Sequence, residues 1–492
     1  MRYRILGLAA VAVMLLAAAA AASLEPEAQE RGRVHQHLAY RGDEGCGCGG
    51  SALCSHLPLI VIDTGGQRIP GALAEGMDRF GQAVYTASED GLPVITAQAA
   101  VIDNAGANNH LTDPPALKAA ADFRIRGNSS RRFPKLPYLL DLKDGEGNNL
   151  DYPMMGMDAH HEWALHGPIL DKSLIRNYMW YNISGEIMEY APNVRFCELV
   201  LNGRHQGLYL MVETITNGDD CRLPLRLDTK NAEATGYLLR VDRPTETELE
   251  SIRDVYTFAE RDGQIAQDIA IRYPGRGRLT EALKKSIELD VSAFEKAIFS
   301  YDYNTGQYGY WNWVDVDSFV DYFLINEFTK NSDAGGYSTY LYKEVGGKFK
   351  LCVWDFNNVC DNFREEVQEP ENFLMVKRFW YFMMLKDEAF VERLLARYGE
   401  LRRGVLSEAY LMNYIDETLD WLGPAIDRNN DRWGDEMANW EGLMPPERNI
   451  HSHREGVEQL REWLCERGGW LDENIHALRQ YAHPSRNKKF SH

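Results

Sequence analysis

The sequence predicts an α+β protein with two lobes, a sheet-rich N-lobe followed by a mainly helical C-lobe. Apolar runs with strand-like patterns, bounded by Gly, Asn and Asp, fill most of the chain before residue 278. Helical apolar periodicity takes over after that point and is interrupted by one small hairpin. The 492 residues, 45% hydrophobic and 11% aromatic, fit two to four domains or one large two-lobed unit with a sizeable core. We therefore expect an N-lobe over 57–277 and a C-lobe over 278–482.

The first 23 residues have the pattern of a secretory signal peptide. Arg2 and Arg4 precede an apolar stretch that ends in small residues. The run 5–22 is also nearly long enough to span a bilayer, so a membrane anchor is the alternative. Cleavage is favoured because the Ala-rich end offers many small-residue cleavage sites. We expect a secreted or cell-surface protein that contacts a membrane only if the signal segment 1–23 is uncleaved.

The charge balance argues against nucleic acid as a partner. Lys and Arg total 53 against 73 Asp and Glu, a net charge of −20, which repels a phosphate backbone. The one short basic run, at 486–490, lies in the polar tail 483–492.

The eight cysteines are an even number, and export permits disulfides. Three of them lie in the Gly-containing linker 24–56, namely Cys46, Cys48 and Cys54. A metal site there would have only three thiols, and the nearest histidine is His56, so disulfides or free thiols are favoured. Cys352 and Cys360 flank Asp355, where a bridge would stiffen the chain.

Strand patterns in the N-lobe are short apolar runs that end at turn residues. They occur at 57–64, 122–130, 135–149, 236–241 and 254–260. The second and third of these predict one hairpin, and the two apolar runs around Asn202-Gly203 predict another over 194–215.

Helical patterns begin with 171–190, where Asp171 is the expected N-cap and Pro192 follows the end. The C-lobe continues this pattern at 280–301, 316–331 and most of 380–482. The stretch 427–436 resembles a calcium loop, but Arg432 stands where such a loop requires Gly. We expect a solvated helix junction there instead.

Two carboxylates stand at the ends of elements in the C-lobe. Asp333 follows a helix in a Gly-rich loop, and Asp355 ends the second strand of the hairpin formed by 337–344 and 348–354. That hairpin would bring both carboxylates to the same end of the structure. Phosphoryl transfer needs one carboxylate to orient or deprotonate a hydroxyl and another to hold magnesium. The alternative is that both are ordinary turn residues, since Asp is common in turns.

A basic loop in the N-lobe could supply the cation that phosphate needs. Arg126 and Lys135 surround a Gly-Asn-Ser-Ser turn whose polar residues are Asn128, Ser129 and Ser130. Backbone N–H groups and hydroxyls in such a turn can bind phosphate oxygens, with Lys135 or Arg126 providing charge. Without the acidic pair, an exposed basic hairpin would be the preferred interpretation.

Several stretches in fixed order carry a resemblance to a known family. RGNSSR, KLPY, DKSLIRNY, ELVLNGRHQGLYLMVE, NSD, YLY and VWDFN together resemble the spore-coat CotH family of atypical protein kinases. The motifs cover about 122–362, and their order and spacing extend the resemblance to most of 57–480. The resemblance implies a bilobal atypical protein-kinase-like fold. It also implies transfer of the γ-phosphoryl group of ATP, with Mg²⁺ or Mn²⁺, to Ser or Thr of a protein substrate.

The resemblance also assigns roles to individual residues. Asp333 matches the catalytic Asp, Asp355 matches the metal-binding Asp, and Lys135 takes the place of the nucleotide-phosphate Lys. The loop with Arg126, Asn128, Ser129 and Ser130 would lie beside the nucleotide. Glu213 is a candidate ion partner for Lys135, with Glu186 and Glu189 as alternatives.

Two departures from the family pattern bear on activity. Asn357 stands where the family usually has Asp, and Ser338 where it usually has Asn. Both still offer oxygens to a metal, but with less charge. A catalytically impaired surface scaffold or adhesion protein is therefore the alternative function. A hydrolase using Asp333 and Asp355 as an acid/base pair is a third reading, which leaves the basic loop without a role.

Overall fold

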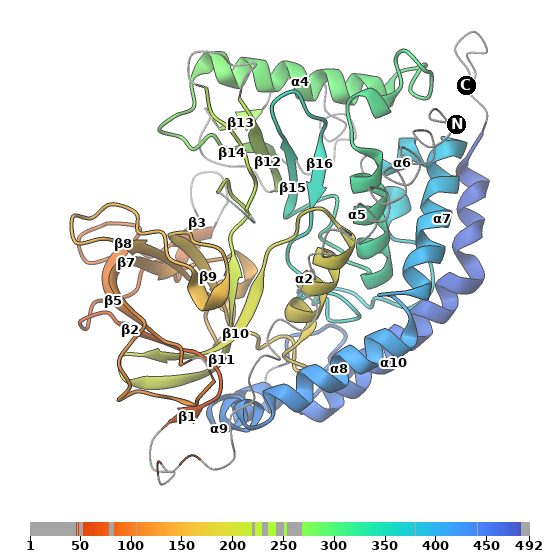
Figure 1. The fold of residues 1–492 in the computed structure, drawn as a ribbon. Helices are drawn as coiled ribbons and strands as arrows, with labels where there is room; N and C mark the ends of the chain where they lie inside the picture. The colour runs from red at the N-terminus through yellow and green to blue at the C-terminus, as the bar shows by residue number, and fades with distance from the viewer. Residues whose placement is uncertain are drawn as a thin grey trace, which may run out of the picture.

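The protein has a mixed α+β architecture in the computed structural model. The structure describes residues 46, 48, 53–77, 83–104, 106–218, 222–228, 235–242, 250–252, 268–378, 380–439 and 441–483. The expected signal segment 1–23, most of the linker 24–56, the strand expected at 254–260 and nearly all of the tail 483–492 lie outside those residues. Strands from the first part of the chain gather on one side of the molecule, and the long C-terminal helices gather on the other (Figure 1).

Seven of the described strands close into a barrel in the order β10-β11-β9-β8-β7-β5-β2. They are β2 (Leu59–Asp63), β5 (Ile95–Ile102), β7 (Leu117–Ile125), β8 (Tyr138–Lys143), β9 (Glu162–His166), β10 (Val194–Leu201) and β11 (Arg204–Glu213). Neighbouring strands are antiparallel except β10 and β2, which run parallel. Alternate side chains such as Phe123, Leu140 and Trp163 are fully buried and fill the interior.

Both hairpins predicted in this region are confirmed. Phe123 of β7 lies opposite Leu140 of β8. Asn202 and Gly203 have φ values of 50° and 74°, as the tight turn between β10 and β11 requires. Two small sheets flank the barrel: β1 (Cys54–Ser55) pairs with β6 (Asn109–His110), and β3 (Leu73–Met77) pairs with β4 (Ala83–Tyr85).

A second sheet joins strands from both halves of the chain. Its order is β13 (Ser251–Ile252), β14 (Asp268–Tyr273), β12 (Tyr237–Asp242), β15 (Thr339–Lys343) and β16 (Lys350–Cys352). The predicted hairpin β15–β16 is confirmed, with Leu341 opposite Leu351. Because β12 pairs with β15, residues before and after position 278 share this sheet.

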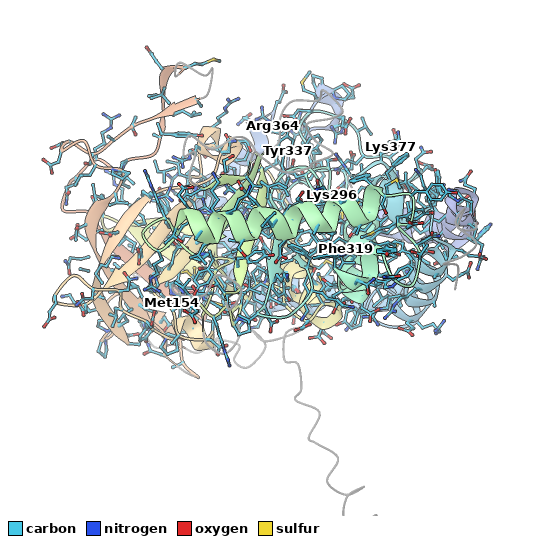
Figure 2. All side chains as sticks on the ribbon, turned by 90° about the horizontal axis from the view of Figure 1, so that it is seen from above. Met154, Lys296, Phe319, Tyr337, Arg364 and Lys377 are labelled. Atoms are coloured by element: carbon cyan, nitrogen blue, oxygen red, sulfur yellow. The ribbon has the colours of Figure 1, made fainter. Side chains whose placement is uncertain are left out.

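Helices cover the remaining faces. They are α2 (Arg176–Ile187), α4 (Glu281–Phe299), α5 (Val316–Thr329), α6 (Tyr381–Met384), α7 (Glu388–Arg403), α8 (Glu408–Leu422), α9 (Pro424–Asn439) and α10 (His453–Asn474). Helix α4 lies across one end of the molecule, above the second sheet in Figure 1 and in front when seen from above in Figure 2. Asp290 fastens it to that sheet by pairing with Lys343 and accepting from the Tyr237 hydroxyl at 2.8 Å. None of the helices among the described residues has the length and apolar character needed to cross a bilayer.

Two helix predictions need correction. Helix α2 begins at Arg176 rather than after Asp171, because Leu174 has a φ of 66° that no α-helix accommodates. The Asp171 carboxylate still accepts the backbone N–H groups of Ser173 and Arg176 at 3.0 and 2.8 Å. The expected junction at 427–436 lies inside the single helix α9, whose buried face includes Asn429 and packs on β11.

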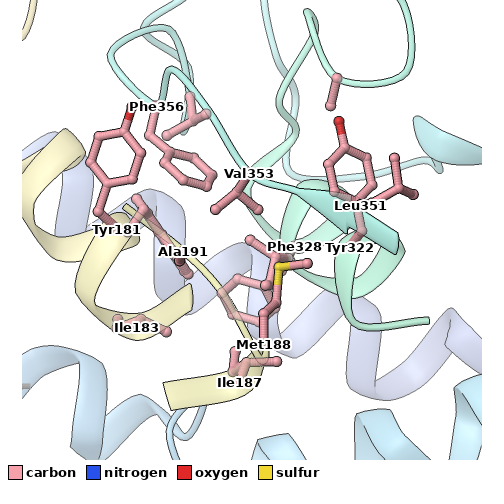
Figure 3. Packing of buried hydrophobic residues seen from close by; sticks show 14 of the residues in the cluster. Tyr181, Ile183, Ile187, Met188, Ala191, Tyr322, Phe328, Leu351, Val353 and Phe356 are labelled. Atoms are coloured by element: carbon pink, nitrogen blue, oxygen red, sulfur yellow. The ribbon is translucent and has the colours of Figure 1, made fainter. Parts of the chain in front are cut away.

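The main core joins α2 to the C-terminal part of the chain. Tyr181, Ile187 and Met188 come from α2 and its end, and they approach Phe328 and Phe356 from the C-terminal half (Figure 3). Nearly every side chain of α2 is buried, so α2 is a buried core helix rather than an amphipathic surface helix. This position lets α2 set the geometry of the segment that follows β16.

Candidate functional site in the pocket at Asp355

A pocket with about 750 Å³ of empty space lies where the barrel, the second sheet, α2 and the segment after β16 meet. Its lining residues are Arg126, Gly127, Ser129, Ser130, His166, Asn177, Tyr181, Val212, Arg240, Asp242, Ser338, Tyr340, Trp354, Asp355 and Asn357. These residues come from both halves of the sequence. Part of the empty space is open to solvent, and polar groups dominate the lining.

Helix α2 holds Asp355 in an unusual backbone conformation. Asp355 has a φ of 61°, in the left-handed region that few residues other than Gly adopt. Its N–H donates to the Tyr181 hydroxyl at 3.0 Å, and the next N–H, of Phe356, donates to Asn177 Oδ1 at 2.8 Å. Asn177 and Tyr181 lie four residues apart and therefore on one face of α2. This conformation costs free energy for a residue other than Gly and persists only where surrounding contacts hold it. It is therefore typical of a functional site rather than of an ordinary turn.

Arg176, the first residue of α2, anchors the far end of the same segment. Its guanidinium donates to the Val359 carbonyl at 3.1 Å and to the Cys360 carbonyl at 3.3 Å. It also forms a buried ion pair with Asp171, with 2.5 Å between Nη1 and Oδ1. Both ends of the segment 355–360 are thus fixed by one helix.

The Asp355 carboxyl has a strongly perturbed pKa. Burial and the nearby negative charge of Asp333 raise it from 3.8 to about 7, while the positive charge of Arg126 opposes the shift. Ionisation of this carboxyl is unfavourable in the absence of a nearby cation. A bound cation would offset both the burial of the negative charge and its repulsion by Asp333, so Asp355 is a good cation ligand.

Asn357 adds a second oxygen beside Asp355. Its side chain is buried, and its Oδ1 has no hydrogen-bond partner among the described residues. Its amide nitrogen donates to Asn358 Oδ1 at 3.0 Å, which directs the oxygen away from that neighbour. A buried acceptor without a donor is costly unless a ligand satisfies it. Asp355 and Asn357 together offer hard oxygen ligands, so the residues present fit Mg²⁺ or Mn²⁺.

Asp333 lies beside this site without lining the pocket. Asn358 Nδ2 donates to Asp333 Oδ2 at 3.2 Å. Asn331 links the two acidic residues, because its Oδ1 accepts from the Asp333 N–H at 3.3 Å and its Nδ2 donates to the Asp355 carbonyl at 3.4 Å. The structure therefore brings the two predicted carboxylates into one neighbourhood.

Positive charge reaches the pocket from arginines. The Arg126 guanidinium lies 5.5 Å from the centre of the Trp354 ring, in a cation–π arrangement. Arg240 and Asp242 pair across the pocket edge, with 3.5 Å between Nε and Oδ2. Ser129 and Ser130 also line the pocket, as the basic-loop prediction requires, whereas Asn128 does not line it and accepts from the Tyr85 hydroxyl at 3.4 Å.

The predicted role of Lys135 needs correction. Its ammonium is fully buried, donates to the Leu208 carbonyl at 2.5 Å and to Asn429 Oδ1 at 2.7 Å, and is absent from the pocket lining. Burial also lowers the pKa of Lys135 well below its ordinary value. Lys135 therefore ties the barrel to α9, and Arg126 is the cation of this loop that faces the pocket.

Two of the three ion partners proposed for Lys135, Glu213 and Glu189, are engaged elsewhere. Glu213 accepts from the backbone N–H of Asn193 at 2.9 Å and from its side-chain amide at 3.1 Å. Glu189 pairs with Lys350 at 2.7 Å. The bridge considered between Cys352 and Cys360 is not formed, and the Cys352 thiol donates to the Val353 carbonyl at 3.4 Å.

Sequence reasoning missed several pocket residues. Arg240 and Asp242 stand two apart on β12 and so share one face of the sheet, and Tyr340 lies directly opposite Arg240 on β15. The alternation of apolar and charged residues over 236–242 could have shown that Arg240 and Asp242 share a face. Nothing in that segment indicated that this face meets the pocket. Asn177 and Tyr181 were hidden within an apolar helix pattern.

Comparison with known proteins adds an independent finding. A family model described as CotH kinase protein matches residues 123–471, which include every pocket residue named above. Among curated proteins, the chain is similar to the Inner spore coat protein H of Bacillus subtilis (strain 168), with 23% identity over 245 residues. That match covers 48% of this chain and 58% of the relative, so the chain spans little more than half of the relative's length.

Proposed function

Because the chain belongs to the CotH kinase protein family, we propose that it transfers the γ-phosphoryl group of ATP to a Ser or Thr hydroxyl of a protein. The family resemblance carried by the sequence motifs is confirmed by this membership. The observation that carries the proposal is the pocket at Asp355, which is lined by a carboxylate of raised pKa, by Asn357 with its unsatisfied Oδ1, and by the arginines Arg126 and Arg240. Phosphoryl transfer depends on positioning and charge stabilisation, and the oxygens and arginines of this pocket support a role in both.

Asp355 and Asn357 would hold Mg²⁺ or Mn²⁺, which when bound neutralises phosphate charge. Arg126, and Arg240 held by Asp242, would contact phosphate oxygens through their planar guanidinium groups. N–H and hydroxyl groups of the turn at Ser129 and Ser130 can donate to the same oxygens.

Asp333 is suited to the acceptor hydroxyl. It would orient that hydroxyl and take its proton as the new O–P bond forms, while the bond from the γ-phosphorus to the bridging oxygen breaks and ADP leaves. The link through Asn358 fixes the Asp333 carboxylate beside the pocket. Asp333→Asn should therefore impair transfer more than nucleotide binding.

The aromatic wall of the pocket suits the base of the nucleotide. The Tyr340 and Trp354 rings lie 6.0 Å apart, and the Tyr181 ring lies 5.8 Å from Trp354. Such faces stack on a purine. We also propose that the protein acts at a cell surface, in line with the signal-like segment and with the printed name of the spore-coat relative.

The test is a binding and transfer assay on the full chain with ATP and either Mg²⁺ or Mn²⁺. Calorimetry should show ATP binding that requires the metal, and mass spectrometry should show added phosphate on the protein or on a Ser/Thr-rich acceptor protein. Asp355→Ala and Arg126→Ala should each weaken metal–ATP binding at least about tenfold. Asp435→Ala and Arg454→Ala, which change exposed side chains outside the pocket, are the matched controls.

A wild-type protein that binds no ATP with either metal would refute this proposal. ATP binding without transfer to any protein would instead favour the surface-scaffold function. Asn357 favours that second function, because an amide gives the cation site one negative charge fewer than a second carboxylate would.

A further inference from the structure

Three thiols and one imidazole meet at the edge of the barrel, away from the pocket at Asp355. One ligand atom from each of Cys46, Cys48, Cys54 and His110 can be chosen so that all four lie within 4.8 Å of one another. Strand β1 pairs with β6 so that Cys54 stands directly opposite His110. The structure records the three sulfurs as thiols rather than as a disulfide.

We propose that Cys46, Cys48, Cys54 and His110 bind a structural Zn²⁺ ion in a tetrahedral site. Zinc–sulfur and zinc–nitrogen bonds of about 2.3 and 2.0 Å place tetrahedral ligand atoms about 3.5–3.8 Å apart. The Cys46 sulfur and His110 Nε2 are 3.3 Å apart, so the four atoms need to move little to enclose the ion. Four protein ligands leave no open position for a substrate, which is the mark of a structural site.

The surroundings of the cluster match those of a zinc site. Asp113 Oδ2 lies 3.2 Å from His110 Nδ1, which leaves Nε2 of that ring to face the sulfurs. A carboxylate behind a ligating histidine fixes the tautomer that binds zinc. Asn104 donates to the same Asp113 oxygen at 2.7 Å, and Asn108 donates to the Cys54 sulfur at 3.1 Å. Donors of this kind stabilise a thiolate.

The donor set favours zinc over a disulfide. A disulfide would use two of the three thiols and leave the third beside His110. Thiolate sulfur with one imidazole is a donor set that Zn²⁺ accepts in closed tetrahedral geometry. His56, the histidine nearest in sequence, packs its ring 5.2 Å from that of Trp421 and is not in the cluster.

The proposed ion would cross-link the segment at Cys46 and Cys48 to strands β1 and β6 beside the barrel. Cys46 and His110 are 64 residues apart, and a cross-link that closes a long loop restricts the unfolded chain. This cross-link would include Cys54, the neighbour of Ser55, whose hydroxyl accepts from Arg428 of α9 at 3.1 Å. It would therefore hold the region preceding the barrel against α9, whether or not the pocket at Asp355 transfers phosphate.

The experiment measures the metal content of the full-length protein purified without chelators and then incubated with ZnCl₂ under reducing conditions. Elemental mass spectrometry should find about one zinc per chain after gel filtration. Cys48→Ser and His110→Gln should each reduce the content at least about fivefold. Cys465→Ser on α10 and His161→Gln, whose imidazole pairs with Asp151 at 3.0 Å, are matched controls that should keep the zinc.

Cobalt provides a readout that does not depend on variant folding. Titration of the metal-free wild type with Co²⁺ should produce thiolate-to-cobalt charge transfer and the intense visible bands of tetrahedral coordination, both removed by Zn²⁺. A wild type that takes up no zinc, or that shows only octahedral cobalt, overturns the proposal. Zinc retained in both cluster variants, or a disulfide among these cysteines in the purified protein, overturns it as well.

Discussion

Two fully buried cations, Arg176 and Lys135, support different parts of the molecule. Arg176, 1% exposed, donates to carbonyl groups of the segment that carries Asp355 and pairs with Asp171. Lys135, 0% exposed, donates to a carbonyl of β11 and to a side chain of α9. A buried cation thus contributes to the site when the backbone groups that it binds belong to a segment that lines the pocket. Arg176 supports the site and Lys135 supports the barrel, although the sequence motifs favoured the lysine.

The largest effect is expected for Arg176→Met. The change leaves the Asp171 carboxylate buried without its cation, which should lower the free energy of unfolding by about 3–5 kcal/mol. It also removes the Arg176 donors to the Val359 and Cys360 carbonyls, although Gln459 Nε2 still donates to Cys360 at 3.1 Å, so the segment with Asp355 should bind Mn²⁺ more weakly in the protein that remains folded. Urea denaturation and a Mn²⁺ titration check both parts. A loss of stability below about 1 kcal/mol would contradict the supporting role.

Lys135→Met should lower stability but leave the pocket intact. The Leu208 carbonyl loses a donor, and we expect a loss of about 2–3 kcal/mol. Metal–ATP affinity should stay within about twofold of the wild type, because Lys135 lies outside the pocket lining. Calorimetry on the folded variant is the measurement. A tenfold or greater loss of ATP affinity would restore Lys135 as a phosphate ligand and contradict the structure-based assignment.

The burial of Lys135 depends on contacts that are distant in sequence. Its partner Asn429 is 294 residues away. Two glycines make room: a Cβ on Gly167 would lie 3.0 Å from Lys135 Cγ, and a Cβ on Gly207, where φ is +74°, would lie 2.7 Å from Asn429 Oδ1. No local pattern could indicate that a helix near the end of the chain packs there. The direction of this side chain was therefore beyond sequence reasoning.

The acidic part of the site was predictable because it depends on local structure. The hairpin and Asp333 before it are short-range features that the structure contains, although β16 ends at Cys352, three residues before Asp355. The start of α2 was not predictable, because the positive φ of Leu174 follows from the buried pair of Asp171 and Arg176 rather than from helix propensity. A metal site at Cys46, Cys48 and Cys54 was set aside on sequence grounds because it lacked a fourth ligand, and His110 comes beside Cys54 only through the pairing of β1 with β6.

Asp355→Asn should change the pH dependence of stability in metal-free protein. With its pKa raised to about 7, the folded state holds the Asp355 proton more tightly than the unfolded chain does. Ionisation therefore lowers wild-type stability as pH rises from about 4 to about 7, and the neutral Asn escapes this loss. The shift of roughly three units is equivalent to about 4 kcal/mol, which solvent screening in the partly exposed pocket should reduce to about 1–2 kcal/mol.

Urea denaturation in EDTA at several pH values provides the measurement. The stability gained by Asp355→Asn should be small near pH 5 and reach its full value near pH 8. The exposed control Asp435→Asn should show no such trend. A gain that does not vary with pH would mean that Asp355 titrates like an ordinary surface carboxyl. The site supported by Arg176 would then not differ from the barrel region at Lys135 in its electrostatics.

The smallest effect is expected for Asn357→Asp, which tests whether the unsatisfied Oδ1 is a metal ligand. A second carboxylate at this position should tighten Mn²⁺ binding about fivefold near pH 8, a gain of about 1 kcal/mol. The gain should vanish near pH 6, because a like charge beside Asp355 raises its pKa further and the pair then retains a proton. Asn439→Asp at an exposed position is the matched control. If affinity near pH 8 does not improve, Asn357 Oδ1 is not a ligand, and Asp355 holds the cation without it.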